Sequence, residues 1–276
     1  MTQERLHHVY GLQTLSLKMF EGNCYFVDLY AGRGFNFVPQ EESTKESSKT
    51  AVLPGSPITL LAAMKNAMRF IDFTGTPTVI LNDVDADRYS QLSSSVRRWA
   101  DKSNVFLGSQ VSSVSFLSKN QTTVDVKLQY SNHTAKHVLD KLAHTLYMDS
   151  GSCAIITIDP NVPSDIPYDS LKSLYAKYRD RVTVIVGISA GAMKRISGNK
   201  AVNPHLNFKY VPDNLFALLD LLESNSGFIR EPITTGQWTV LVLTPVKQHW
   251  LIARSGFHII KSDSGKKLID KLSVAA

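Results

Sequence analysis

Short apolar runs alternate along this chain with longer segments in which apolar residues recur at helical spacing. The runs predict strands over residues 24–29, 76–83, 104–109, 152–160 and 181–189. The segments between them predict helices over residues 3–20, 56–70, 86–100, 134–147 and 164–178. This alternation is typical of a parallel sheet whose two faces are both covered by helices.

The last third of the chain changes character. Residues 190–197 and 213–224 predict further helices, and residues 227–245 predict two strands joined through a turn at 234–236. Such a hairpin adds antiparallel strands to the edge of the sheet. A short helix over residues 262–272 closes the sequence.

We expect a single α/β domain spanning residues 1–276, with three segments added to the basic alternation. Residues 1–22 form an N-terminal helix ahead of the first strand. Residues 36–53 form a mobile surface loop, because their central part, QEESTKESSKT, is polar and has no apolar anchor. Residues 110–132 alternate only weakly, which fits either a strand pair or an insertion.

A glycine-rich turn follows the first predicted strand, in the stretch YFVDLYAGRG. Asp28 ends the strand, and Gly32 and Gly34 come directly after it. Ligands of open α/β sheets bind beyond the carboxyl ends of the strands, and glycines let the backbone approach a ligand with no Cβ in between. In the alternative interpretation, Asp28 only caps the backbone amides of its own turn.

The second predicted strand also ends in acidic residues. An ionised carboxylate only accepts hydrogen bonds, and therefore suits the hydroxyl groups of a ribose. We expect Asp83 to have this role, with Asn82 or Asp85 as alternatives. The spacing from Gly34 to Asp83 is longer than the ~20 residues of a dinucleotide-binding fingerprint, and no Gly-Lys-Ser/Thr follows the turn as in a Walker loop.

The composition bounds the partners and the surroundings of the protein. The chain has 30 basic and 24 acidic residues, a net charge of +6 that permits a polyanionic partner without demanding one. Cys24 and Cys153 lie in predicted strands and are interpreted as buried thiols in a reducing cytoplasm. No apolar run approaches the ~20 residues of a membrane helix, and no residue cluster has metal-site spacing, so we expect a cytoplasmic protein without membrane contact or metal.

Four motifs in chain order, VDLYAGRG, PGSPITLL, VILNDVD and IITIDPN, resemble those of class I S-adenosylmethionine-dependent methyltransferases. More narrowly, they are similar to the three-Cys-motif partner (TcmP) proteins of bacteria and phages, where DLFAGPG, GSP and IDP occur in this order. The resemblance covers about residues 23 to 195. It implies a Rossmann-like fold with a mostly parallel seven-stranded sheet and a C-terminal antiparallel hairpin, and S-adenosylmethionine as cofactor.

The resemblance also implies a role for each matched position. The first turn would hold the methionine end of the cofactor, through Asp28, Tyr30, Ala31, Gly32, Arg33 and Gly34. Asp83 would hold the ribose, and Ser109, after the expected third strand, would lie near the adenine. Asp159, with Pro160 and Asn161, would face the transferred methyl group and orient or deprotonate the acceptor.

Two positions depart from the family pattern. Arg33 stands where the family usually has proline, and its guanidinium either grips the cofactor carboxylate or a substrate phosphate, or points to solvent. Residues 159–162 read DPNV and lack the aromatic residue with which amino-methylating enzymes stack on a flipped base. Tyr168 could supply this stacking instead.

Four further residues are candidates for substrate contact. Lys194 and Arg195 follow the fifth predicted strand and form either a phosphate-contacting patch or a solvated helix face. Arg230 and Trp238 lie in the C-terminal hairpin and form either a substrate wall or part of the core. The resemblance implies a methyltransferase, and with the net charge of +6 it implies one that acts on nucleic acid or a modified nucleotide. The alternatives are a catalytically inactive partner protein of another enzyme, and an enzyme using a different nucleotide on the same sheet.

Overall fold

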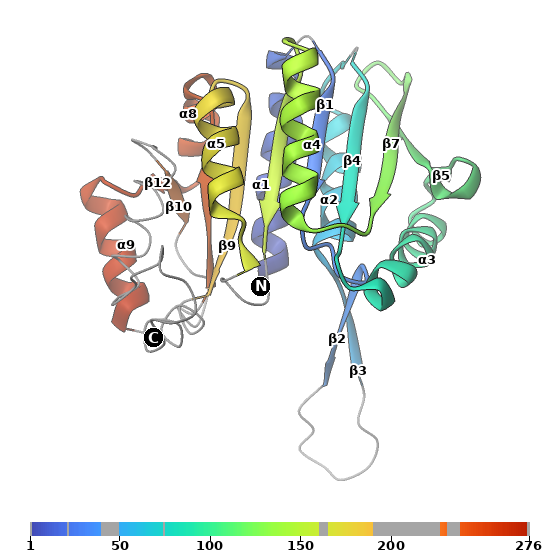
Figure 1. Ribbon diagram of the computed structural model, residues 1–276, viewed down its shortest axis with the longest axis horizontal. Helices are drawn as coiled ribbons and strands as arrows, with labels where there is room; N and C mark the ends of the chain where they lie inside the picture. The colour runs from blue at the N-terminus through green and yellow to red at the C-terminus, as the bar shows by residue number, and fades with distance from the viewer. Residues whose placement is uncertain are drawn as a thin grey trace.

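The computed structural model describes residues 2–20, 22–39, 50–73, 75–159, 165–189, 227–230 and 238–274. Within them, ten strands join in one large sheet with helices packed against it, and two further strands form a separate ribbon (Figure 1). The described chain is therefore a mixed α/β fold, as the alternation of apolar runs and helical segments predicts.

The centre of the sheet is parallel. Its five strands are, in spatial order, β7 (Thr123–Ser131), β4 (Pro77–Asn82), β1 (Cys24–Asp28), β8 (Cys153–Ile158) and β9 (Val182–Ser189). Strands later in the chain extend the sheet from β1 in both directions, so the order of connection reverses at this strand. Because parallel strands share their direction, the carboxyl ends of β4, β1 and β8 lie next to one another at a topological switch point.

Antiparallel strands flank this centre on both sides. β6 (Ser113–Leu117) and β5 (Phe106–Leu107) follow β7, while β11 (Trp238–Leu243), β10 (Phe228–Arg230) and β12 (Phe257–Ile259) follow β9. The two antiparallel strands predicted in residues 227–245 are confirmed by the pairing of β10 with β11. The expectation of seven strands is corrected, because β5, β6 and β12 extend the sheet at its two edges.

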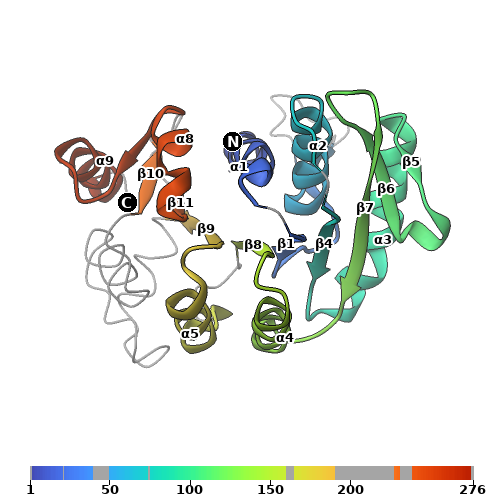
Figure 2. The same cartoon turned by 90° about the horizontal axis from the view of Figure 1, so that it is seen from above.

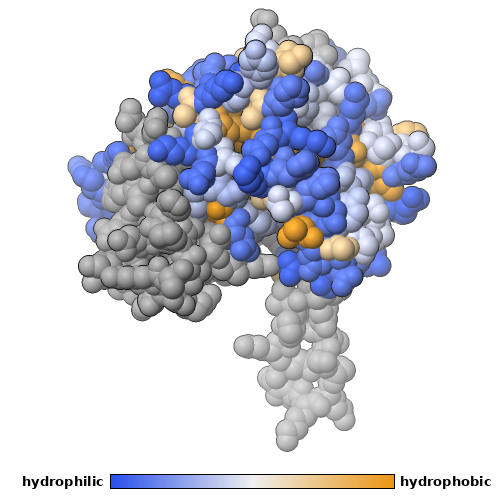
Figure 3. All heavy atoms as spheres, in the orientation of Figure 1, coloured by the Kyte–Doolittle hydropathy of each residue, from blue (hydrophilic) through white to orange (hydrophobic). Residues whose placement is uncertain are grey.

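Helices cover both faces of the sheet (Figure 2). α1 (Thr2–Leu15), α2 (Ser56–Met68) and α3 (Ala86–Lys102) share one core cluster with β1, β4, β6 and β7. α4 (Ala135–Met148) and α5 (Tyr168–Tyr178) share a second core cluster with β8 and β9. α8 (His249–Ala253) and α9 (Asp263–Val274) contact β12. The outer face formed by α4 and α5 is mainly hydrophilic (Figure 3).

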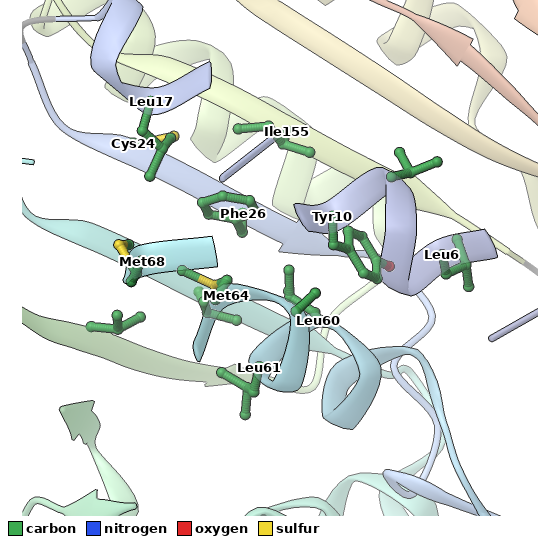
Figure 4. Close-up of a cluster of buried hydrophobic side chains, with 14 of the residues drawn as sticks. Leu6, Tyr10, Leu17, Cys24, Phe26, Leu60, Leu61, Met64, Met68 and Ile155 are labelled. Carbon is green, nitrogen blue, oxygen red and sulfur yellow. The ribbon is translucent and has the colours of Figure 1, made fainter. Parts of the chain in front are cut away.

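Strand β1 contributes to both core clusters because successive side chains of a strand point to opposite faces. Cys24 and Phe26 belong to the cluster under α1 and α2, whereas Val27 and Leu29 belong to the cluster under α4 and α5. Figure 4 shows Phe26 beside Met64 of α2 in the first of these clusters. Fully burying a side chain of this size contributes about 1.5–3 kcal/mol to folding, so β1 is held firmly where the site begins.

The short strand predicted over residues 104–109 is present as β5, but it pairs antiparallel with β6 at the edge of the sheet and does not belong to the parallel centre. This segment supplies only the two-residue edge strand β5, and the parallel partner of β4 is β7. Buried and exposed residues alternate along β7, so its sequence lacks the continuous apolar run typical of a central parallel strand. Of the two alternatives for residues 110–132, the strand pair is confirmed, because β6 and β7 pair there.

The loop expected over residues 36–53 is also corrected. Both of its ends form an antiparallel ribbon made of β2 (Phe35–Pro39) and β3 (Thr50–Pro54), which projects from the body in Figure 1. Residues 40–49, and the helices expected over residues 190–197 and 213–224, lie outside the described residues. Within the described ranges, no helix is both long and apolar enough to span a bilayer.

Candidate functional site

A cavity of about 710 Å³ opens at the carboxyl edge of the sheet. Its walls come from four separate connections, at residues 29–33 after β1, 82–85 after β4, 134–135 after β7 and Asp159 after β8. Gly55 and Ser56 at the start of α2 complete it. The cavity therefore lies at the switch point, where ligands of open α/β sheets bind.

The turn after β1 is shaped by its two glycines. Gly32 and Gly34 have φ angles of +61° and +89°, in the left-handed region that other residues rarely adopt. The amides of this turn point towards the end of β4, since Ala31 N donates to Asn82 O over 2.8 Å and Gly32 N donates to Asp83 Oδ2 over 2.8 Å. A Cβ on Gly34 would lie 2.7 Å from Ser95 Cβ, so the turn also needs glycine to pack against α3.

The geometry distinguishes the three candidates at the end of β4. Asp83 lines the cavity and accepts hydrogen bonds from Gly32 N and Asp85 N, which fix its carboxylate and leave lone pairs for a ligand. Asp85 is occupied as the N-cap of α3, where its Oδ1 accepts from two backbone amides of the first turn. These amide bonds, with the one from Arg88 the largest cause, hold the pKa of Asp85 below its ordinary value.

The third candidate, Asn82, has a structural role. Its side-chain amide donates to Leu29 O and His133 O, and its Oδ1 accepts from His133 N. Asn82 thus ties together the chain segments that leave β1, β4 and β7, which form three walls of the cavity. The His133 segment leads directly into Thr134 and Ala135, which line the cavity and were not identified from the sequence.

Asp28 lies fully buried beneath the turn. Its Oδ1 accepts from Tyr30 N over 3.2 Å, as the local-cap interpretation predicts, but Oδ2 has no hydrogen-bond partner among the described residues. Desolvation raises the pKa of Asp28 to about 7, opposed by the nearby Ser56 hydroxyl and the Tyr30 amide and assisted by Asp159 and Asp83. A buried carboxyl group with one oxygen that lacks a hydrogen-bond partner is stabilised by a nearby positive charge or hydrogen-bond donor, which a ligand can supply.

Asp159 follows β8 and lines the opposite side of the cavity. It is largely buried, and desolvation raises its pKa to about 6. Its carboxylate packs directly on the backbone of Gly187 in β9, where a Cβ would lie 2.8 Å from Asp159 Cγ. Gly187 is thus a residue that positions the Asp159 carboxylate, and nothing in the sequence of β9 indicated this.

Tyr10 of α1 is buried in the core cluster that α1 and α2 share with β1 (Figure 4). Burial is the main cause that raises its pKa well above the ordinary value, followed by the charges of Asp28 and Asp159. Tyr10 lies in the helix expected over residues 3–20 and was not among the candidate site residues. Its hydroxyl places a further polar group next to the two raised carboxyl groups.

The other predicted residues fall into three groups. Tyr30 and Arg33 line the cavity together with Ala31 and Gly32, whereas Asp28 and Gly34 are not among its lining residues. Ser109 does not line it but begins a short 3-10 helix between β5 and β6, so its expected place near an adenine is corrected. Tyr168 is buried in the core cluster under α5, which corrects its expected stacking role.

The remaining predictions are not decided by the described atoms. Pro160, Asn161, Lys194 and Arg195 lie outside the described residues. Arg230 and Trp238 are described only as backbone positions, at the end of β10 and the start of β11. Trp238 pairs with the last residue of β9, Ser189.

Comparisons with known proteins give distant likenesses only. No protein-family model and no curated protein matches this sequence. Among solved structures, a DUF519 family protein from Legionella pneumophila is similar at 14% identity and a TM-score of 0.48, over 98% of this chain and 91% of its own. A conserved hypothetical protein from Streptococcus pyogenes is similar at 12% identity and a TM-score of 0.38, over 84% of this chain and 91% of its own. A DUF574 family protein from Streptomyces avermitilis is similar at 9% identity and a TM-score of 0.35, over 87% of this chain and 83% of its own. Likenesses this distant carry no argument about function.

Proposed function

We propose that this protein is an S-adenosylmethionine-dependent methyltransferase of class I fold that acts on nucleic acid or a modified nucleotide. The observation that carries the proposal is the meeting of the glycine turn, Asp83 and Asp159 around one cavity at the switch point. The strand arrangement supports it, because five parallel strands are followed by an antiparallel β11 placed between β9 and β10. These strands agree with the mostly parallel sheet and C-terminal antiparallel hairpin that the motifs imply, but the described sheet has ten strands and not the expected seven.

The chain offers matching groups for the ribose and for the methionine end of the cofactor. The carboxylate of Asp83, held by two backbone amides, would accept the ribose hydroxyls. The turn around Gly32 presents backbone without a Cβ, and would hold the methionine end. Asp28 lies buried beneath this turn and does not line the cavity, and it would support the turn by accepting a hydrogen bond from Tyr30 N. The volume of about 710 Å³ lies in the range of about 300–1,000 Å³ that small-molecule sites have.

Bound S-adenosylmethionine supplies a methyl group on a sulfonium, which passes in line to a nucleophilic atom of the acceptor. Such a transfer depends mainly on positioning and on exclusion of water. Asp159 would orient the acceptor by accepting its hydrogen bond, and would take up its proton once the new bond has formed. With a pKa of about 6, its carboxyl group is mostly ionised at neutral pH and so can accept that proton.

Titration calorimetry with S-adenosylhomocysteine tests binding. The unaltered protein is expected to bind S-adenosylhomocysteine. Asp83→Asn should lower the affinity for this ligand at least tenfold, because one of the two backbone amides that donate to the Asp83 carboxylate loses its acceptor. Asp101→Asn, on the exposed side of α3, is the matched control and should bind as the unaltered protein does. Absence of binding by the unaltered protein would contradict the proposal.

A catalytically inactive partner protein is the second candidate. The burial of Tyr168 favours it, because this was the residue expected to stack on a base in place of the missing aromatic. Transfer of a labelled methyl group to RNA, DNA or protein separates the two candidates. A catalyst loses transfer but keeps cofactor binding in Asp159→Asn, whereas an inactive partner binds the cofactor and shows no transfer in either form.

A further inference from the structure

A second, smaller cavity of about 150 Å³ lies beside the main one. It is lined by Arg33, Phe35, Gln91, Ser94, Ser95 and Arg98. Arg33 lines both cavities, so the two are neighbours that share one wall. The elements that form the small cavity, α3 and the base of the β2–β3 ribbon, lie side by side at the same end of the molecule in Figure 1. None of the side chains that line it is acidic.

One stripe of α3 connects the two cavities. Arg88, Gln91, Ser95 and Arg98 follow one another at intervals of three or four residues, so they lie on the same side of the helix. Arg88 lines the main cavity and Arg98 the small one. Ten residues of α-helix separate these two arginines, a distance of about 15 Å along the helix axis. A chain of ligand groups longer than one phosphate therefore fits along this stripe.

The guanidinium groups along the stripe are available for an anion. Arg33 and Arg98 are exposed, and neither takes part in an ion pair with another described residue. Arg88 pairs with Asp85 over 3.6 Å, but both side chains are well exposed, and such pairs contribute little and exchange readily. Asp85 lies at the main-cavity end of the stripe, and its pKa is lowered first by the hydrogen bond from the Arg88 backbone amide and then also by the charges of Arg88 and Arg33.

The uncharged lining residues fix this arrangement and add an apolar wall. Ser95 Oγ donates to Arg33 O over 2.6 Å, which anchors the glycine turn on α3. Ser94 Oγ donates to Gln91 O over 2.8 Å, within the helix. Phe35, at the start of β2, is half-buried and offers a ring next to the arginines. Arginines combined with an aromatic ring are typical of single-stranded nucleic-acid sites.

We propose that the groove formed by Arg33, Phe35 and the Arg88–Arg98 side of α3 binds the phosphate backbone of single-stranded nucleic acid. The strand passes through this groove next to the nucleotide that enters the main cavity. The identity of that nucleotide as a methyl acceptor rests on the proposed function, while the binding of the strand does not. Neutralising three phosphates releases counterions, so the slope of log affinity against log salt is expected to be about −2.

Fluorescence anisotropy with labelled RNA and DNA strands of about 12 nucleotides tests the proposal over a series of salt concentrations. Arg98→Gln removes one guanidinium and should weaken binding about fivefold to tenfold and make the salt slope less steep by about 0.7. Arg97→Gln is the matched control, because this exposed neighbour on α3 lines neither cavity. It should stay within about twofold of the unaltered protein.

Several outcomes would overturn the proposal. One is no strand binding by the unaltered protein, and another is equal binding by Arg98→Gln and Arg97→Gln. Displacement of the strand by AMP or inorganic phosphate at micromolar concentration would assign the groove to a free small anion instead. Calorimetry with S-adenosylhomocysteine on the same samples separates the two proposals, since Arg98 does not line the main cavity. Arg98-dependent strand binding without cofactor binding would contradict the proposed function alone.

Discussion

Replacement of Asp28 by asparagine is expected to stabilise the ligand-free protein above neutral pH. Burial raises the pKa of this carboxyl from 3.8 to about 7. Between pH 4 and pH 7 the native state therefore binds more protons at Asp28 than the unfolded chain does, so the free energy of unfolding falls as the pH rises through this window. One pKa unit corresponds to about 1.4 kcal/mol, so a shift of three units changes the free energy of unfolding by about 4 kcal/mol. Above pH 7 this whole contribution to stability is lost.

Asparagine has the shape of aspartate without its charge. The variant should thus be more stable than the unaltered protein by about 2–4 kcal/mol at pH 8, after allowance for imperfect hydrogen bonding of the new amide, and nearly equal to it at pH 4. Urea denaturation followed by circular dichroism at pH 4, 6 and 8 measures the difference. The exposed Asp101→Asn should change stability by less than about 0.5 kcal/mol at every pH. A difference for Asp28→Asn that is the same at pH 4 and pH 8, or has the opposite sign at pH 8, would refute this reasoning.

Three further substitutions test the geometry around the cavity. Gly187→Ala should lower the kcat of methyl transfer at least tenfold, because its Cβ displaces the Asp159 carboxylate at the end of β8. Gly11→Ala, which has open space around it in α1, should leave this kcat unchanged. Gly34→Ala should destabilise the protein by more than Gly32→Ala. Both positions have a positive φ, which costs about 1–2 kcal/mol for alanine, but only the new Cβ at Gly34 meets a side chain of α3. Equal free energies of unfolding for the two variants would contradict the packing described. Asn82→Ala should lower the free energy of unfolding by about 2–4 kcal/mol in urea denaturation, since it leaves a buried carbonyl, a partly buried carbonyl and an amide without their partner. A loss below about 1 kcal/mol would contradict its bridging role.

The chemistry of the site could be predicted from the sequence better than its shape. An acid followed by two glycines after an apolar strand is a local pattern, and so is an acid at the end of the next strand. These patterns therefore indicated Gly32 and Asp83, which line the cavity, and Asp28, which lies buried beneath the turn. The contact of Gly187 with Asp159 depends instead on the register between β8 and β9, in which Ile158 pairs with Val186. A local sequence pattern does not determine the register between two strands that are distant in the sequence.

The fold shows the same limit. Strands buried on both faces, such as β8, appear as continuous apolar runs and were located to within a few residues. β7 is exposed on one face and was not recognised as a parallel strand. Because residues 104–109 were assigned as the third strand instead, the adenine contact was expected at Ser109. Tyr168 was assigned to a base because its residue type fits stacking, but five apolar or aromatic side chains of α5 form a buried stripe that includes it. A residue type alone does not determine whether a side chain faces solvent or core.

A crystal structure of the protein grown with S-adenosylhomocysteine is the most direct test of the central claim, that the carboxyl edge of β1, β4 and β8 forms a cofactor site. The account predicts the nucleoside in the cavity beside the Gly32 turn, with both ribose hydroxyls on the Asp83 carboxylate. A nucleoside bound at a different place, or crystals that remain without it at saturating concentration, would contradict the account.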